Sequence, residues 1–212
     1  LLGKEIEAVD AAKDLGVFID NDLNYNEHIT KTVSNCFLKL NRINRMKHLL
    51  DKKTLLLLIN SFIFSKLFYC STVWSNTTKA NKQKLQLVQN YAGRLVLGLR
   101  KYDHISKGLK SLNWLNVEDK LFFNDAVMLH KCINNKSPSY LSQKFKRRSE
   151  IQNRITRQSQ DLNIPKCRLA TGQRSFAYRG TKLWNDLPKD LKCINEPMTK
   201  FAYRLTLGNY MN

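Results

Sequence analysis

The chain has 212 residues, of which 42% are hydrophobic and 25% charged, and this composition over this length excludes wholesale disorder. Thirty-six Lys and Arg face 17 Asp and Glu, which gives a net charge of +19 and a pI near 9.9. Such a balance is typical of nucleic-acid-binding proteins, with an acidic protein or an anionic lipid as the alternative partner. Five widely spaced cysteines without a C-x-x-C exclude a disulfide framework and a zinc module, and they fit a reducing compartment.

The positive charge rises toward the C-terminus. Residues 1–78 carry a net charge of +2, residues 79–143 carry +7, and residues 144–212 carry +10. Each neutralised phosphate releases counterions, so we expect electrostatic binding to be strongest in the last third. The first residue is Leu rather than Met, and we therefore expect a piece of a longer protein.

The first predicted element is a β-hairpin within residues 5–19. EIEAV at 5–9 and LGVFI at 15–19 have strand-like composition, and DAAKD between them supplies turn residues. Gly16 would weaken a strand interior unless backbone approaches it closely, so we expect another chain or nucleic acid beside it. We expect Leu15 and Val17 to share one face and pack beneath the first helix.

Residues 26–50 follow the three-to-four spacing of an amphipathic helix. Lys31, Lys39 and Arg42 fall opposite its apolar face, and Arg45 extends them into a basic flank. This flank could bind phosphates, although a solvated helix surface is the alternative for any single lysine.

Asp51 is a candidate N-cap for a second helix that begins at Lys52. The following run over 54–74 is apolar almost all round, which predicts a helix buried in the core. A membrane span is the alternative, but Lys66 lies in the middle of the run and a charge there is costly.

The remaining chain continues the helical pattern. We predict helices at 79–99, near 104–112, near 117–134, near 175–186 and near 197–208, with an irregular basic arm at 144–175. The fold class that follows is mainly α, with a short N-terminal β-hairpin, a helical middle and a helical basic C-terminal extension.

Residues that could carry catalysis are sparse. Asp20 and Asp22 form a D-x-D that could hold a metal ion, but the pattern is more typical of a turn that ends a strand. His130 and Cys132 lie two residues apart, on different faces of the predicted helix. No glycine-rich phosphate loop and no nucleophile elbow occurs. We therefore predict no catalytic residue, no metal site and no cofactor in this chain.

Five motifs in the same order resemble one family. KDLGVFIDNDLNYNEHI at 13–29, FIFSKLFYCSTVW at 62–74, LQLVQNYAGRLVLG at 85–98, the segment 109–141, and RSFAYRGTKLWNDLP at 174–188 are similar to the C-terminal region of metazoan non-LTR (LINE-type, jockey-like) retrotransposon reverse transcriptases. The last motif is the most specific. This family's aromatic-x-D-D motif, which binds the catalytic metal, is absent from the chain.

The resemblance implies an organisation in four segments. Residues 1–25 would hold a palm-adjacent hairpin, with Leu15, Gly16 and Val17 in a primer-grip-like position. Residues 26–100 would be thumb-like helices that track a template–primer duplex, residues 101–143 a helical connector, and residues 144–212 the basic extension. The implied nucleic-acid-binding residues are Lys31, Lys39, Arg42, Arg45, Lys146, Arg147, Arg148, Arg174, Arg179 and Lys182.

The function implied is that of a fragment of an RNA-directed DNA polymerase. Its partners would be RNA, DNA and the missing palm and fingers of the same polypeptide, inside the cell in nucleus and cytoplasm, without a membrane. The parent family uses Mg²⁺, but we expect this fragment alone to be inactive because it lacks the metal-binding carboxylates. A stand-alone basic nucleic-acid-binding module and a decayed transposon remnant are the alternatives.

Overall fold

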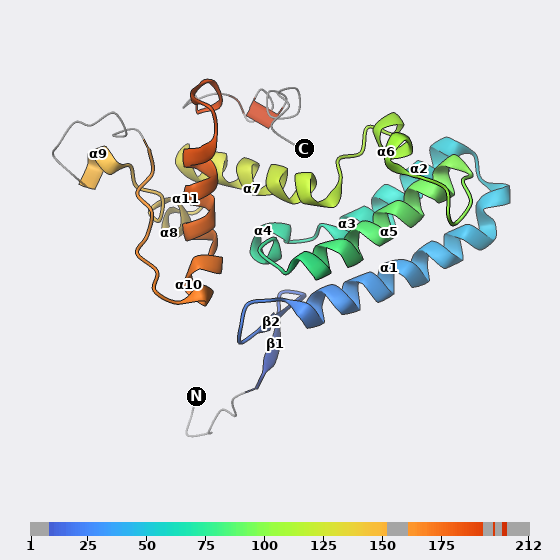
Figure 1. The fold of residues 1–212 in the computed structure, drawn as a ribbon, viewed down its shortest axis with the longest axis horizontal. Coiled ribbons are helices and arrows are strands. Elements are labelled where there is room, and N and C mark those ends of the chain that lie inside the picture. The colour runs from blue at the N-terminus through green and yellow to red at the C-terminus, as the bar shows by residue number, and fades with distance from the viewer. Residues whose placement is uncertain (1–8, 152–160, 193–196, 198–200, 203–212) are drawn as a thin grey trace. The chain divides into compact units, whose positions relative to one another are not determined.

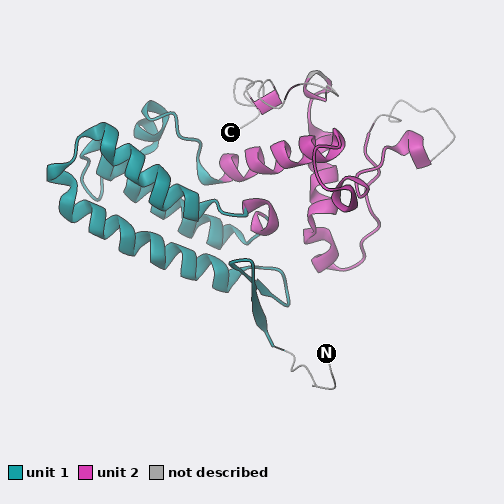
Figure 2. Cartoon of the chain, turned by 180° about the vertical axis from the view of Figure 1, so that it is seen from behind, with its two compact units in different colours: residues 1–70, 76–117 teal, residues 71–75, 118–212 magenta. Residues whose placement is uncertain are grey.

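The computed structural model describes residues 9–151, 161–192, 197 and 201–202, and these are mainly helical after an N-terminal hairpin (Figure 1). The expected fold class is confirmed. The chain forms two compact units (Figure 2). Unit 1 comprises residues 1–70 and 76–117, and unit 2 comprises residues 71–75 and 118–212. The boundary falls inside the range expected to be a connector, and a five-residue segment from the middle of unit 1's sequence belongs to unit 2.

The hairpin exists, but its strands differ from the predicted ones. Strands β1 (Ala11–Asp14) and β2 (Val17–Asp20) pair antiparallel, with Asp14 opposite Val17. Leu15 and Gly16 form the two-residue turn, both with positive φ (42° and 88°), as a type I′ turn requires. The predicted turn DAAKD is therefore mostly strand, and the predicted strand at 5–9 lies almost entirely outside the described residues.

The expectation that Leu15 and Val17 share a buried face was wrong. Leu15 is 84% exposed at the tip of the turn, whereas Val17 is buried. The glycine at position 16 is accounted for by the turn itself, which needs a positive φ there, and the approach of another chain or nucleic acid stays a prediction.

The core of unit 1 lies mainly between α1 (Asn26–Met46) and α5 (Lys79–Leu97). The helical periodicity of both segments was predicted, and their apolar stripes are buried. The buried residues are Ile29, Cys36, Leu40 and Ile43 of α1 and Leu85, Val88, Ala92, Leu95 and Val96 of α5. The Thr78 side chain accepts a hydrogen bond from Asn81 N at the start of α5, and Gly98 ends this helix in the left-handed conformation. After α1, a 3₁₀ turn η1 (Lys47–Leu49) leads to Asp51, and α6 (Ser106–Ser111) follows α5.

The apolar run at 54–74 is not one helix, and it is not buried all round. It forms α2 (Lys52–Ile59), a π-helical turn η2 (Asn60–Phe64), α3 (Ser65–Leu67) and, after a break with positive φ at Cys70, α4 (Ser71–Trp74). Leu55, Ile59, Ile63 and Leu67 are buried at a spacing of four, which the wider π turn helps to keep on one side. Leu57 and Phe62 are 64% and 51% exposed, so the expectation of full burial was wrong.

Unit 2 is built around α7 (Val117–Ile133), which begins at the unit boundary, and α11 (Phe176–Asp186). Its core contains Leu129, Cys132, Trp184, Leu191 and Phe201, all buried. Between these helices lie α8 (Ser139–Ser142), α9 (Arg148–Ile151) and α10 (Ala170–Arg174), and η3 (Lys189–Leu191) follows α11. The predicted helix at 197–208 lies mostly outside the described residues. Within the described part of the chain, no helix is both long and apolar enough to cross a membrane.

Candidate nucleic-acid interface

A basic flank follows one side of α1. Lys31, Lys39 and Arg42 are spaced by eight and three residues, so they lie along one side of the helix over about 16 Å at 1.5 Å per residue. Lys31 and Arg42 are exposed and Lys39 is half-buried, while the opposite side of α1 packs in the core. We call Lys31, Lys39 and Arg42 the α1 flank. Arg45, in the last turn of α1, is also exposed.

Aromatic rings lie beneath the ammonium groups of the α1 flank. The Lys31 ammonium is 3.8 Å from the centroid of the Phe18 ring in β2, and it also pairs with Glu27 at 2.5 Å. The Lys39 ammonium is 3.5 Å from the Phe62 carbonyl oxygen and 6.0 Å from the ring centroid of the same residue. Cation–π contacts orient both lysine stems while their charges stay at the surface. Two of the three cations of the flank, Lys31 and Lys39, therefore lie over aromatic rings.

Nearby lysines affect the pKa values of two buried side chains of α1. Burial, and then the Lys66 ammonium, lower the pKa of His28 below its ordinary value. Burial raises the pKa of the Cys36 thiol to about 11, against an opposing effect of Lys39 and Lys66. Lys66, exposed on α3, is therefore close enough to α1 to act on both side chains, a relation that no local spacing in the sequence indicates.

After Glu27, which pairs with Lys31, the charges of α1 to α5 are almost entirely of one sign. From His28 to Tyr102 the chain contains 14 Lys and Arg but a single acidic residue, Asp51. Each of the 14 is at least partly exposed. The carboxylate of Asp51 is used locally, since it accepts a hydrogen bond from Thr54 N at the start of α2, as predicted for an N-cap. Seven of the eight acidic residues in residues 1–78 precede His28. The net charge of +2 for that whole range therefore does not reveal how basic the part after His28 is.

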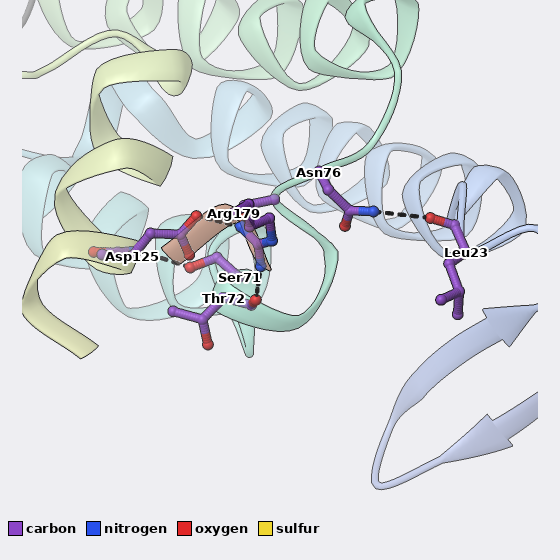
Figure 3. A network of polar contacts seen from close by, with 8 residues as sticks. Leu23, Ser71, Thr72, Asn76, Asp125 and Arg179 are labelled. Carbon is purple, nitrogen blue, oxygen red and sulfur yellow. Dashed lines mark hydrogen bonds and ion pairs between the residues drawn. The ribbon is translucent and has the colours of Figure 1, made fainter. Parts of the chain in front are cut away.

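The hairpin tip is tied to the helices of unit 1. The Tyr69 hydroxyl donates to the Leu15 carbonyl oxygen at 3.0 Å, and a Cβ on Gly16 would lie 3.5 Å from the Tyr69 ring. Beyond the hairpin, the Asn76 side chain donates to the Leu23 carbonyl oxygen at 3.1 Å, as Figure 3 shows. The contact from Tyr69 fixes the tip at Leu15 and Gly16, and the contact from Asn76 fixes the loop that follows β2.

Asp20 serves the loop after β2. Its two carboxylate oxygens accept hydrogen bonds from Asn24 N at 2.7 Å and Asn26 N at 3.2 Å. This arrangement agrees with the predicted turn. Among the residues that the structure describes, no group of three or more His, Cys, Asp or Glu is arranged to hold a metal ion.

The three cations at 146–148 lie in unit 2, where the backbone pairs with residues 161–163. Arg148 N donates to the Asp161 carbonyl oxygen at 2.9 Å, and Asn163 N donates to that of Lys146 at 2.8 Å. Lys146 is exposed, whereas Arg147 and Arg148 are half-buried. Lys146 and Arg147 border a hollow of about 420 Å³ beside α8.

Arg179 has an internal role in unit 2. Its guanidinium pairs with the Asp125 carboxylate and donates to the Ser75 hydroxyl oxygen and the Thr72 carbonyl oxygen (Figure 3). Ser75 in turn donates to Asp125 at 2.7 Å. The network ties α7 and α11 to the segment 71–75. Because its side chain is largely buried and its guanidinium is bonded to Asp125, Ser75 and Thr72, Arg179 is not a candidate for phosphate contacts, in contrast to the exposed Lys31.

Arg174 and Lys182 complete the predicted set. Arg174 is half-buried in the last turn of α10. Lys182 is exposed on α11, with its ammonium 6.0 Å from the centroid of the Tyr178 ring. Lys182 and Arg179 border one hollow, which is distinct from the one beside Lys146 and Arg147.

No protein-family model, no curated protein and no solved structure matches this chain.

Proposed function

We propose that this chain is the C-terminal, non-catalytic part of a non-LTR retrotransposon reverse transcriptase, and that it binds the template–primer duplex through phosphate contacts. Its protein partner would be the palm and fingers of the same polypeptide, which would also supply the carboxylates for Mg²⁺. The role would be exercised inside the cell, where the element's RNA is copied.

One observation carries the nucleic-acid part of this proposal. Between His28 and Tyr102 there are 14 basic residues and one acidic residue, all 14 at least partly exposed, and the α1 flank presents three of them in a row. Duplexes are bound without sequence preference when cations meet the phosphate backbone, and an RNA–DNA hybrid is recognised largely by its shape. A helix with one buried face and one cationic side provides such a surface.

The test is fluorescence anisotropy with the purified chain, an RNA–DNA hybrid and a single strand, at several salt concentrations. We expect affinity to fall steeply with salt. The triple variant Lys31→Gln, Lys39→Gln, Arg42→Gln should lose more affinity for the hybrid than for the single strand. It should also flatten the slope of log affinity against log salt by roughly one unit per lost contact.

A matched control removes the same charge elsewhere in unit 1. Lys101, Lys107 and Lys110 are exposed and follow α5, away from α1 in sequence. Their triple replacement by Gln should affect hybrid and single strand equally. Equal losses for the α1 variant and this control would exclude the α1 flank as a duplex surface. Binding that does not depend on salt, or no binding at low salt, would remove the nucleic-acid role altogether.

The C-terminal cations give a second comparison. Replacing Lys146, Arg147 and Arg148 together should weaken binding about equally for strands of different sequence, because phosphates carry no base information. The parent polymerase is tested separately by reading the coding sequence upstream for an aromatic-x-D-D motif, whose absence would favour a stand-alone basic module.

A further inference from the structure

Unit 2 contains an open hollow of about 670 Å³ along α11, and both apolar and charged side chains line it. This volume lies within the range of roughly 300–1,000 Å³ typical of small-ligand sites. Phe122 of α7, Leu183 and Leu187 form its apolar part. Tyr178, Lys182 and Asp186 form a polar row on its α11 side.

The polar row has a fixed order that follows from the helix. Tyr178, Lys182 and Asp186 are spaced by four residues, so each is about 6 Å further along the axis and on the same side of α11. Tyr178 is half-buried, while Lys182 and Asp186 are exposed. An aromatic ring, a cation and a carboxylate therefore follow one another along a single wall, next to the apolar residues of the hollow.

Lys182 supplies the cation of this wall. Arg179 also borders the hollow, but its guanidinium is paired with Asp125 and bonded to Ser75 and Thr72. Asp186, one turn after Lys182, would repel a second phosphate. The hollow thus combines one site for a phosphate, a ring for stacking, an apolar surface for a flat base, and a carboxylate that can accept hydrogen bonds from the edge of a base.

We propose that this hollow binds one unpaired nucleotide of a single-stranded RNA or DNA. The base stacks against Tyr178 and the apolar wall, its phosphate pairs with Lys182, and Asp186 accepts a hydrogen bond from a donor on the base edge. Single strands are bound through such combinations of aromatic rings and cations, since every base has a flat face. The inference rests on the proposed nucleic-acid-binding function and adds to it a second, base-dependent contact that the α1 flank does not make.

The experiment compares a ten-nucleotide strand with an abasic strand of equal length and charge, by fluorescence anisotropy with the full chain. The wild-type chain should bind the strand with bases roughly tenfold more tightly than the abasic one. Tyr178→Leu should abolish most of this difference. Tyr140→Leu is the matched control, since Tyr140 is 70% exposed on α8 and does not border the hollow, and it should leave the difference unchanged.

The phosphate contact is tested with a second pair of variants. Lys182→Gln should weaken single-strand binding several-fold and leave the RNA–DNA hybrid within twofold of wild type. Lys189→Gln removes another exposed charge, one that does not border the hollow, so it should change both affinities by less than twofold. Circular dichroism of each variant checks that the helices are intact.

The outcomes separate this inference from the proposed function. If the wild-type chain binds abasic and normal strands equally while retaining salt-dependent binding, the nucleotide site is excluded and the phosphate-binding function stands. The same holds if Tyr178→Leu behaves like Tyr140→Leu. If the chain binds neither strand nor the hybrid at low salt, both proposals fail. Ultraviolet cross-linking of a 4-thiouridine strand should label the peptide that contains Tyr178, and labelling confined to unit 1 would count against the site.

Discussion

His28 lies at the start of α1, where β2 meets this helix. The ring is buried, and Phe18 N lies 3.5 Å from its Nδ1, which acts as the acceptor in the neutral form. Burial and the Lys66 charge both disfavour the imidazolium and lower the pKa of His28. Protonation would remove the acceptor and add a buried cation beside Lys66, so this side chain makes the folding of unit 1 sensitive to pH.

We expect the free energy of unfolding to fall as the pH is lowered from about 7 to 5. Because the folded pKa of His28 lies below the unfolded value near 6.5, the unfolded chain takes up this proton first. The stabilisation is therefore complete above the unfolded pKa and is lost below it. Thermal denaturation at several pH values measures the effect. His28→Gln should reduce the slope, whereas replacing the exposed His48 should not, and equal slopes in both variants would contradict this account.

Asp125 and Arg179 form an ion pair within unit 2. Both side chains are largely buried, so removing one partner leaves the other charge without its match. Asp125→Ala should destabilise the protein by roughly 3–5 kcal/mol in chemical denaturation. The double variant Asp125→Ala, Arg179→Met should be clearly more stable than the sum of the two single losses predicts. Additive losses would show that the pair does not couple α7 to α11.

At the level of elements, the turn of the hairpin contains a residue that is unfavourable for its backbone conformation. Leu15 adopts a φ of 42°, although a branched apolar side chain gains nothing from this conformation, and its side chain is exposed. The contact that holds the tip, from the Tyr69 hydroxyl, goes to the backbone oxygen of Leu15 and does not depend on its side chain.

Replacing Leu15 by Asn should therefore stabilise unit 1 by several tenths of a kcal/mol to about 1 kcal/mol, since Asn-Gly is preferred in type I′ turns. Gly16→Ala should act in the opposite direction by about 1 kcal/mol, because Gly16 has a φ of 88°. Melting temperatures of both variants decide the point, and a lower value for Leu15→Asn would mean that the turn is not of this type in solution.

The elements also show what sequence patterns can predict. Periodicity located α1, α5, α7 and α11 because each has one continuous apolar face against a core. The hairpin was predicted at the wrong position for two reasons. Leu-Gly is not a common turn sequence, and Ala-Ala-Lys-Asp, which forms β1, lacks β-branched residues. The run at 54–74 was misjudged for another reason. A sequence that is apolar on all sides does not indicate which side of the helix will pack against the core. The π turn at Asn60–Phe64 and the break at Cys70 depend on tertiary packing.

The candidate site was predictable only where charges lie on one helix. The α1 flank follows from a spacing along a single element. By contrast, Asp125 and Arg179 are 54 residues apart, and Ser75 and Arg179 are 104 residues apart. No local spacing links such residues, so Arg179 looked like any other surface cation in the sequence. Its internal role became visible only from the packing of unit 2.

At the level of the whole molecule, the two units are not consecutive in sequence. The segment 71–75 is flanked on both sides by unit 1 but belongs to unit 2. Within unit 2, Ser71, Trp74 and Ser75 are buried, and the Asn124 side chain donates to the Ser71 hydroxyl oxygen at 2.8 Å. A single cut between residues 117 and 118 therefore cannot yield two complete units.

We expect a fragment of residues 1–117 to be cleaved readily by chymotrypsin near Tyr69 and Trp74, because it lacks Asn124, Asp125 and Arg179. The full chain should resist cleavage at Trp74, whose side chain is buried. Limited proteolysis with mass spectrometry distinguishes the two. Equal resistance in fragment and full chain would show that the segment 71–75 is protected without the rest of unit 2.

The same segment sets an order of events during synthesis on the ribosome. Residues 71–75 emerge early, but the guanidinium that binds Thr72 and Ser75 belongs to a residue more than 100 positions later. At a synthesis rate of about 5–20 residues per second, roughly 5 to 20 s pass between the synthesis of Trp74 and that of Arg179, and unit 2 cannot be complete before then. During that interval the nascent chain carries an exposed aromatic segment between two portions of unit 1. Slow codons or chaperone binding between Glu118 and Arg179 would therefore change how long this segment stays exposed before unit 2 forms.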